Sequence, residues 1–129
     1  MGQIKIFGLA SELNRSKAKM SDVIHSCIVD AFRFPQDKRF HRFFPMEKEN
    51  FYFGAGRTDR YTIIEVSIFE GRSIEAKKEL ISLIFSRFKT ELNIEKDDIE
   101  LTIFETPKEN WGIRGLPGDE LVLNYKVEV

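Results

Sequence analysis

The chain contains 129 residues with a formal charge of -1, and its 42% hydrophobic and 32% charged residues are typical of a folded globular protein. This length is close to that of one typical domain, about 150 residues, so there is no room for a second independent core. The balance of 20 basic and 21 acidic residues gives no overall positive field, which argues against nucleic acid and anionic membranes as partners. The composition is unusual in its 12 phenylalanines.

The N-terminal residues contain neither a basic segment followed by a long apolar run nor a segment long enough to span a membrane. We therefore expect a cytoplasmic protein without a membrane partner. The single cysteine, Cys27, lies on the apolar stripe of a predicted helix. It is interpreted as a buried packing residue, because one cysteine forms neither an internal disulfide nor a cysteine-rich metal site.

The first half of the chain predicts a strand, a helix and a second strand. Residues 3–9 alternate in hydrophobicity, which is typical of a strand. Apolar residues between 20 and 34 then recur at spacings of three and four, which predicts an amphipathic helix. Residues 39–44 are the predicted second strand.

The second half repeats this order. Residues 61–70 predict a strand, residues 80–92 have helical spacing, and residues 99–105 predict another strand. Ser73 is a suitable N-cap for this helix, and Glu75 lies in its first turn. The final segment, 121–129, alternates with apolar residues at the odd positions. It predicts one more strand, either on the chain's own sheet or added to the edge of a neighbouring subunit.

A shift of 60 positions superimposes the two halves, including the identical tripeptides at 48–50 and 108–110. We interpret residues 1–129 as a single domain with pseudo-repeats at about 3–50 and 63–110 and the C-terminal strand at 121–129. Each repeat is a β-α-β unit with a right-handed crossover. The predicted fold class is α+β, with a four-stranded sheet and two helices on one face.

Two helices cover only one face of such a sheet. The opposite face is predicted to carry Phe7, Leu9, Phe40, Phe44, Ile63, Phe69 and Phe104. An apolar face of this size is normally buried, which favours packing against other copies of the chain. The alternative is a monomer in which residues 45–60 and the C-terminal segment fold over the face.

Several arginines next to predicted turns are candidates for binding an anion. Arg57 lies in the glycine-containing segment 54–60, Arg72 precedes the second helix, and Arg114 follows Trp111 in segment 110–115. Arginine suits bidentate binding of a carboxylate, and a neighbouring aromatic side chain suits a small planar acid. Segment 54–60 is equally well explained as a turn leading into a strand. Solvated surface arginines are the alternative for each residue.

The two histidines have no metal-ligand spacing to cysteine or carboxylate residues, so no metal site is predicted. His41 takes the place of Leu101 in the repeat, and an interior histidine is favoured over a catalytic one. Binding of nucleic acid through Arg57, Arg60 and exposed phenylalanines would need a basic surface, which the net charge of -1 does not support.

Segments 57–65, 69–73 and 109–115, together with the duplication and the chain length, resemble the tautomerase superfamily. The resemblance is closest to the branch that contains malonate semialdehyde decarboxylase. It implies a cofactor-independent protein and a homotrimer of β-α-β chains, with sites near the subunit junctions. In that superfamily, removal of the initiator methionine exposes a catalytic proline. Here Gly2 occupies this position, so the corresponding group is a primary amine.

The resemblance also implies the substrate-binding residues. Arg72 matches one of two arginines at the start of the second helix in the decarboxylase branch, and Glu70 replaces the other. The acidic residue of that branch aligns with Lys38, and Asp37 lies one position earlier. The implied site thus contains Gly2 as the catalytic residue, and its binding residues are Arg72, Arg57, Trp111, Arg114 and Asp37.

Two functions follow. The first is keto-enol tautomerisation of a small 2-oxo or 3-oxo acid, with the Gly2 amine transferring the proton and Arg72 holding the carboxylate. The second is a catalytically inactive trimer that binds a small molecule or has a structural role. The missing proline is the sequence feature that separates them.

Overall fold

The computed structural model describes residues 2–129 of the chain. Two β-α-β units follow one another along the sequence. The first comprises β1 (Gly2–Leu9), α1 (Ala10–Phe32) and β2 (His41–Met46). The second comprises β3 (Thr62–Phe69), α2 (Ile74–Leu92) and β4 (Ile99–Thr106). A two-stranded hairpin follows, made of β5 (Gly112–Ile113) and β6 (Leu116–Pro117).

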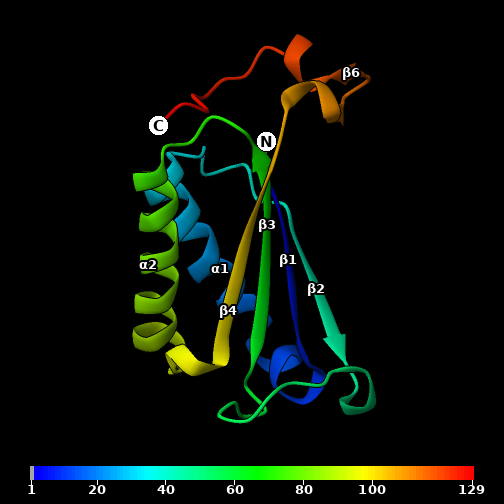
Figure 1. Cartoon of the computed structure of the whole chain (residues 1–129), viewed down its shortest axis with the longest axis vertical. Coiled ribbons are helices and arrows are strands. Elements are labelled where there is room, and N and C mark those ends of the chain that lie inside the picture. The colour runs from blue at the N-terminus through cyan, green and yellow to red at the C-terminus, as the bar shows by residue number, and fades with distance from the viewer. Residues whose placement is uncertain (1) are drawn as a thin grey trace.

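The four long strands form one sheet in the order β2-β1-β3-β4. Within each unit the two strands are parallel, and the units meet through the antiparallel pair β1 and β3. Both helices lie on the same face of this sheet (Figure 1). The predicted α+β class and the duplicated β-α-β architecture are therefore confirmed.

The core lies between the sheet and the two helices. Ile6 and Ile64 of the central strands are fully buried, as are Ile24 of α1 and Leu80 of α2. Burying one such side chain stabilises the fold by about 1.5–3 kcal/mol. Cys27 also belongs to this core, as predicted, and burial raises the pKa of its thiol.

The helix termini follow local sequence signals to different degrees. The Ser73 hydroxyl oxygen accepts a hydrogen bond from the backbone N–H of Ala76 at 3.1 Å, so the predicted N-cap of α2 is confirmed. By contrast, α1 begins directly after Leu9, without a side-chain cap. Its first turns carry few apolar residues, so the periodic pattern reveals only its second half.

The sheet face opposite the helices is covered only in part. Phe40, Phe44 and Phe104 are 48%, 37% and 47% exposed, whereas Leu9 and Phe69 are buried. Leu9 packs with residues of the β2–β3 connection, and Phe69 packs with residues of the C-terminal segment. The alternative of self-coverage is thus correct at the two ends of this face. The phenylalanines of the edge strands β2 and β4, Phe44 and Phe104, remain exposed.

The C-terminal segment, residues 121–129, forms no strand in the single chain, which corrects the prediction that it joins the chain's own sheet. Its side chains still alternate, with Val127 buried and the flanking Lys126 and Glu128 exposed. The Val129 carbonyl oxygen accepts a hydrogen bond from the Ser73 N–H at 3.1 Å. Addition of this segment to a neighbouring subunit stays a prediction.

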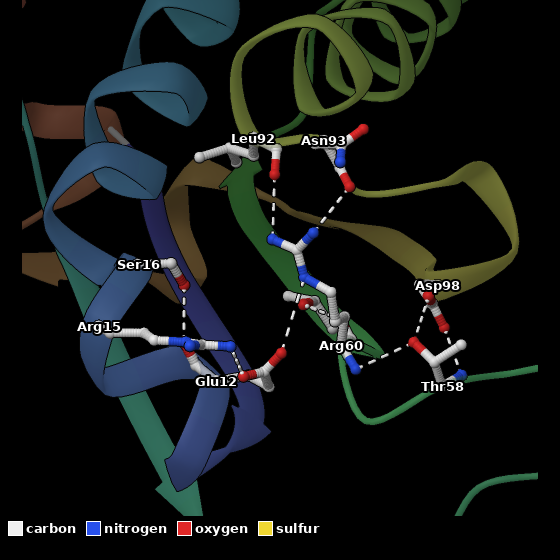
Figure 2. Close-up of polar contacts among 9 residues, drawn as sticks. Glu12, Arg15, Ser16, Thr58, Arg60, Leu92, Asn93 and Asp98 are labelled. Atoms are coloured by element: carbon white, nitrogen blue, oxygen red, sulfur yellow. Dashed lines mark hydrogen bonds and ion pairs between the residues drawn. The ribbon is translucent and has the colours of Figure 1, made fainter.

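The turn that leads into β3 is held by hydrogen bonds to the second unit (Figure 2). The Arg60 guanidinium donates to the carbonyl oxygens of Leu92 and Asn93 at 3.0 and 2.7 Å. These carbonyls end α2, where a cation also complements the helix dipole. The Asp98 carboxylate accepts from the Thr58 N–H at 2.7 Å and from its hydroxyl at 2.6 Å.

Replacement of Asp98 tests how much this turn contributes to stability. Asp98 is buried, and Asp98→Ala leaves both Thr58 donors without their acceptor, so we expect the free energy of unfolding to fall by about 1–3 kcal/mol. Urea unfolding at fixed protein concentration measures the change. The exposed neighbour gives a matched control, Asp97→Ala, which should stay within about 0.5 kcal/mol of the native chain. Equal losses in both variants would contradict the assignment.

Candidate functional site

The start of β1 lies in an apolar environment next to the end of β3. Gly2 is buried and pairs with Ile68 across the antiparallel ladder. A Cβ atom at Gly2 would lie 3.0 Å from Cζ of Phe34, so the backbone and this ring approach each other closely. A cavity of about 10 Å³ lies beside Gly2, with His25, Lys38 and His41 in its wall. It holds at most one water molecule.

Arg72 is buried directly after the turn that follows β3, with only 5% of its surface exposed. One guanidinium nitrogen, Nη1, donates to the Phe69 carbonyl oxygen at 3.1 Å. The Nε and Nη2 atoms are buried and have no hydrogen-bond partner within residues 2–129. The guanidinium carbon lies 5.1 and 5.4 Å from the ring centres of Phe32 and Phe34, a cation–π arrangement.

No carboxylate of the described chain forms an ion pair with Arg72. Burial lowers the pKa of its guanidinium, and this shift is opposed first by Tyr125, through charge and hydrogen bonding, and then by Glu105 and Glu128. An arginine stays protonated in such surroundings. A buried cation with two free donors matches the needs of a carboxylate, which accepts two parallel hydrogen bonds from a guanidinium group.

Phe34 connects the two sequence-predicted residues at this end of the sheet. Its ring contacts the position of the Gly2 Cβ atom and also lies beneath the Arg72 guanidinium. Trp111 is linked to this place only through Phe69: its ring packs edge-on against the Phe69 ring at 5.2 Å, and the Phe69 carbonyl receives the Arg72 hydrogen bond. The structure thus connects Gly2 and Arg72 through Phe34, and it shows no contact of Trp111 with either.

The other predicted residues lie further from this place. Asp37 is exposed in the α1–β2 connection, and its neighbour Lys38 lines the Gly2 cavity. Arg57 precedes β3, whereas Arg72 follows it, so the eight residues of the strand separate them by about 26 Å. Arg57 instead lies over the Tyr61 ring at 5.7 Å. Within one chain, Arg57 does not share a site with Gly2.

Sequence reasoning missed Tyr125, which lies at this site through the C-terminal segment. Its ring centre is 5.1 Å from that of Phe34, and its buried hydroxyl has no hydrogen-bond partner in the described part of the chain. Burial raises the pKa of Tyr125, while Arg72 and the exposed Arg114 lower it. The odd-numbered alternation of segment 121–129 was the available signal that this side chain faces inward.

The two histidines are held by hydrogen bonds. The His25 Nε2 atom donates to the Gln36 carbonyl oxygen at 2.9 Å, and His41 Nδ1 lies 2.8 Å from the Ser21 hydroxyl oxygen. Burial, assisted by His25 and Arg39, lowers the pKa of His41 to about 4. These contacts agree with an interior histidine at His41. Within residues 2–129, no group of three histidine, cysteine or carboxylate side chains has a metal-binding arrangement.

The duplicated β-α-β units and their four-stranded sheet make this chain a small α+β protein, and a buried arginine, Arg72, lies near the start of its first strand. The family model described as "Tautomerase enzyme" matches residues 38–114, well over half of the chain. The chain therefore belongs to this tautomerase family. The matched range includes Arg72 and Trp111 but begins after Gly2.

Relatives and solved structures extend this similarity. A probable tautomerase of Bacillus subtilis (strain 168), YusQ, is 29% identical over 98 residues, covering 72% of this chain and 77% of the relative. A malonate semialdehyde decarboxylase has a TM-score of 0.80 at 20% identity, covering 93% of this chain and 99% of that chain. An asymmetric trimer of a fused 4-OT protein has a TM-score of 0.78 at 18% identity, covering 91% of this chain and 96% of that chain.

Neither of the two long helices in the described part of the chain has an apolar stretch that could span a membrane.

The low pKa of His41 predicts a dependence of stability on pH. Its pKa falls from 6.5 in the unfolded chain to about 4 in the folded one, so the unfolded state binds the proton more readily in this window. The stabilisation linked to neutral His41 is fully present above pH 6.5 and is lost as the pH falls towards 4. We expect His41 to account for about 1–2 kcal/mol, since its partly exposed ring reduces the effect.

Urea unfolding of the native chain and of His41→Gln at several pH values measures this contribution. The native chain should lose more stability than the variant between pH 6.5 and 4, because glutamine does not titrate. Parallel pH profiles for the two proteins would show that His41 is not the group responsible.

Proposed function

We propose that this chain binds a small 2-oxo or 3-oxo acid beside Gly2 and interconverts its keto and enol forms without a cofactor. The observation that carries the proposal is Arg72, a buried cation with two unpartnered donors next to the start of β1. A carboxylate is the ligand that satisfies both donors at once. The probable tautomerase named in Bacillus subtilis supports the reaction class.

The proposed chemistry needs one proton carrier. After removal of Met1, the free amine of Gly2 has an ordinary pKa of about 7.7–8.0, so part of it is unprotonated at neutral pH. The amine removes a proton from the carbon next to the substrate carbonyl, and the C–H electron pair forms the enolate double bond. Returning the proton to the carbonyl oxygen gives the enol. Arg72 holds the carboxylate in place and stabilises the developing negative charge.

The second candidate function is an inactive protein that binds the same acids. Gly2, in place of the proline found in the resembling superfamily, is the observation that favours it. A primary amine on a flexible residue lacks the secondary-amine basicity and the rigid ring of proline. In this case Arg72 and Trp111 retain the ligand, and no proton is transferred.

We also propose that the chain forms a homotrimer. The fused 4-OT structure to which it is similar is a trimer, and the exposed Phe40, Phe44 and Phe104 lie on the sheet face that the helices do not cover. Covering these rings removes apolar surface from water. A site near a subunit junction would then receive further residues from a neighbouring chain.

Activity assays of three variants test the catalytic proposal. We expect the native chain to convert the enol of an arylpyruvate to its keto form, and Arg72→Met to lose at least tenfold in kcat/KM, because the guanidinium is replaced by an apolar stem. Gly2→Pro introduces the secondary amine. Gly2→Ala is its matched control, since it meets Phe34 with the same Cβ atom but keeps the primary amine.

The result separates the two functions. An inactive native chain in which Gly2→Pro alone creates activity would exclude the enzyme hypothesis and favour the binding protein. Intact mass measurement on the same samples shows whether Met1 is removed, which decides whether the Gly2 amine is free.

Light scattering tests the assembly. We expect the native protein to have three times the 15.1 kDa mass of the chain. Phe44→Glu should shift it towards the monomer, because the charge lies on the proposed contact face, where Phe44 stacks on Phe7 at 4.7 Å. Tyr52→Glu is the matched control, as Tyr52 is 88% exposed in the β2–β3 connection. A monomeric native chain would contradict the trimer.

A further inference from the structure

The C-terminal segment, residues 121–129, crosses the turn that carries Arg72. The Tyr125 ring packs on Phe34, and Val127 packs on Phe69 and lies 3.0 Å from the position of a Cβ atom at Gly71. The Val129 carbonyl oxygen then binds the Ser73 N–H. Figure 1 shows the segment passing over the end of the sheet at which β1 begins and reaching the start of α2. It therefore covers the candidate site.

Two buried polar groups lie close together under this segment. The Phe34 ring contacts both the Tyr125 ring and the Arg72 guanidinium, at 5.1 and 5.4 Å. The Tyr125 hydroxyl and the guanidinium are near enough to shift each other's pKa by charge and hydrogen bonding. Their geometry is nevertheless outside that of a hydrogen bond, and neither the hydroxyl nor Nε and Nη2 of Arg72 has another partner within residues 2–129. Buried polar groups are nearly always hydrogen-bonded. One acceptor with several lone pairs, such as a carboxylate, would satisfy all three atoms.

We propose that Tyr125 is a second binding residue for the substrate carboxylate, and that residues 121–129 form a flap that closes over the bound acid. The Tyr125 hydroxyl donates to one carboxylate oxygen, while Nε and Nη2 of Arg72 donate to the carboxylate as a fork. This inference rests on the proposed function, because it concerns the same acid at the same arginine.

The way in which the segment is held supports its movement. In the described chain, one main-chain hydrogen bond, from Ser73 to Val129, joins residues 122–129 to the rest of the protein. The other attachments are the inward side chains of Leu123, Tyr125, Val127 and Val129. A segment without a strand ladder opens at a lower free-energy cost than a sheet strand does.

The space beside Gly2 is too small for a ligand. The cavity there measures about 10 Å³, enough for one water molecule, and neither Arg72 nor residues 121–129 line it. A three-carbon acid is several times larger. An acid that contacts both Gly2 and Arg72 therefore requires covering residues to move, and residues 122–129, which cover Arg72, have one main-chain hydrogen bond to the rest of the protein.

Tyr125→Phe separates the hydroxyl from the ring. The variant keeps the aromatic packing on Phe34 and removes only the hydrogen-bond donor. Loss of one hydrogen bond to a charged group weakens binding by about tenfold to hundredfold. Lys126→Ala is the matched control, because Lys126 is exposed on the same segment. Its affinity should equal that of the native chain.

The experiment is calorimetric titration of pyruvate and malonate into the full-length native chain, Tyr125→Phe, Lys126→Ala and Arg72→Met. We expect Arg72→Met to abolish binding and Tyr125→Phe to weaken it at least tenfold, while thermal melts show that each variant is folded. If Tyr125→Phe binds the acid as tightly as the native chain and Arg72→Met does not bind it, the role of Tyr125 is overturned and the proposed function still stands. Absence of native binding at millimolar acid, or unchanged binding by Arg72→Met, would overturn both.

Hydrogen exchange of the native chain tests the flap independently of affinity. Saturation with the tighter-binding acid should slow amide exchange in residues 121–129, because closure over the ligand stabilises their contacts. The exposed segment 52–57 at the opposite end of the sheet serves as the internal reference. Unchanged exchange in residues 121–129 of a saturated protein would overturn the flap.

Discussion

The antiparallel pairing of β1 and β3 positions the entire candidate site. Because Gly2 pairs with Ile68, the beginning of the first strand lies beside the turn that ends the third. Arg72 follows that turn, and its guanidinium is buried against Phe32 and Phe34. Burial of an unpaired cation is costly, and such residues are normally retained where they bind a partner of opposite charge.

The two ends of the sheet treat an arginine in opposite ways: Arg60 is half-exposed and Arg72 is buried. At one end, Arg60 donates to the last carbonyls of α2 and lies 3.8 Å from Glu12, so its charge and its donors are satisfied. At the other end, Arg72 has one hydrogen bond and two free nitrogens. The internal repeat aligns Glu12 with Arg72. At this repeat position the first unit thus carries an acid that pairs with Arg60, whereas the second carries an arginine without an ion-pair partner in the described residues.

The architecture could be predicted from the sequence because each helix and strand has its own local hydrophobic periodicity. The strands at 3–9 and 61–70 alternate, Ser73 caps its helix, and the repeat predicts the order of elements. The candidate site was predictable only where a residue adjoins a strand end, as Gly2 and Arg72 do. Trp111 stays a prediction, and its contact with Phe69 depends on how the chain folds back after β4.

The errors in the sequence-based predictions have a common physical origin. Strand alternation predicts which side chains share a face, but not which other segments cover that face. Residues 121–129 have the alternation of a strand and lack its ladder, since side-chain packing on Phe34 and Phe69 holds them. Tyr125 could not be assigned to the site for the same reason. Arg57 and Arg72 both lie beside turns, but within one chain the whole of β3 separates them, and their meeting across a subunit junction stays a prediction.

The close approach of Phe34 to Gly2 couples the two ends of the site mechanically. A Cβ atom at this position meets the phenylalanine ring at 3.0 Å, so the ring has to give by a few tenths of an ångström. The pyrrolidine ring of proline adds more atoms than a single Cβ. Because the same ring lies against the Arg72 guanidinium, a side chain added at position 2 is felt at the arginine as well.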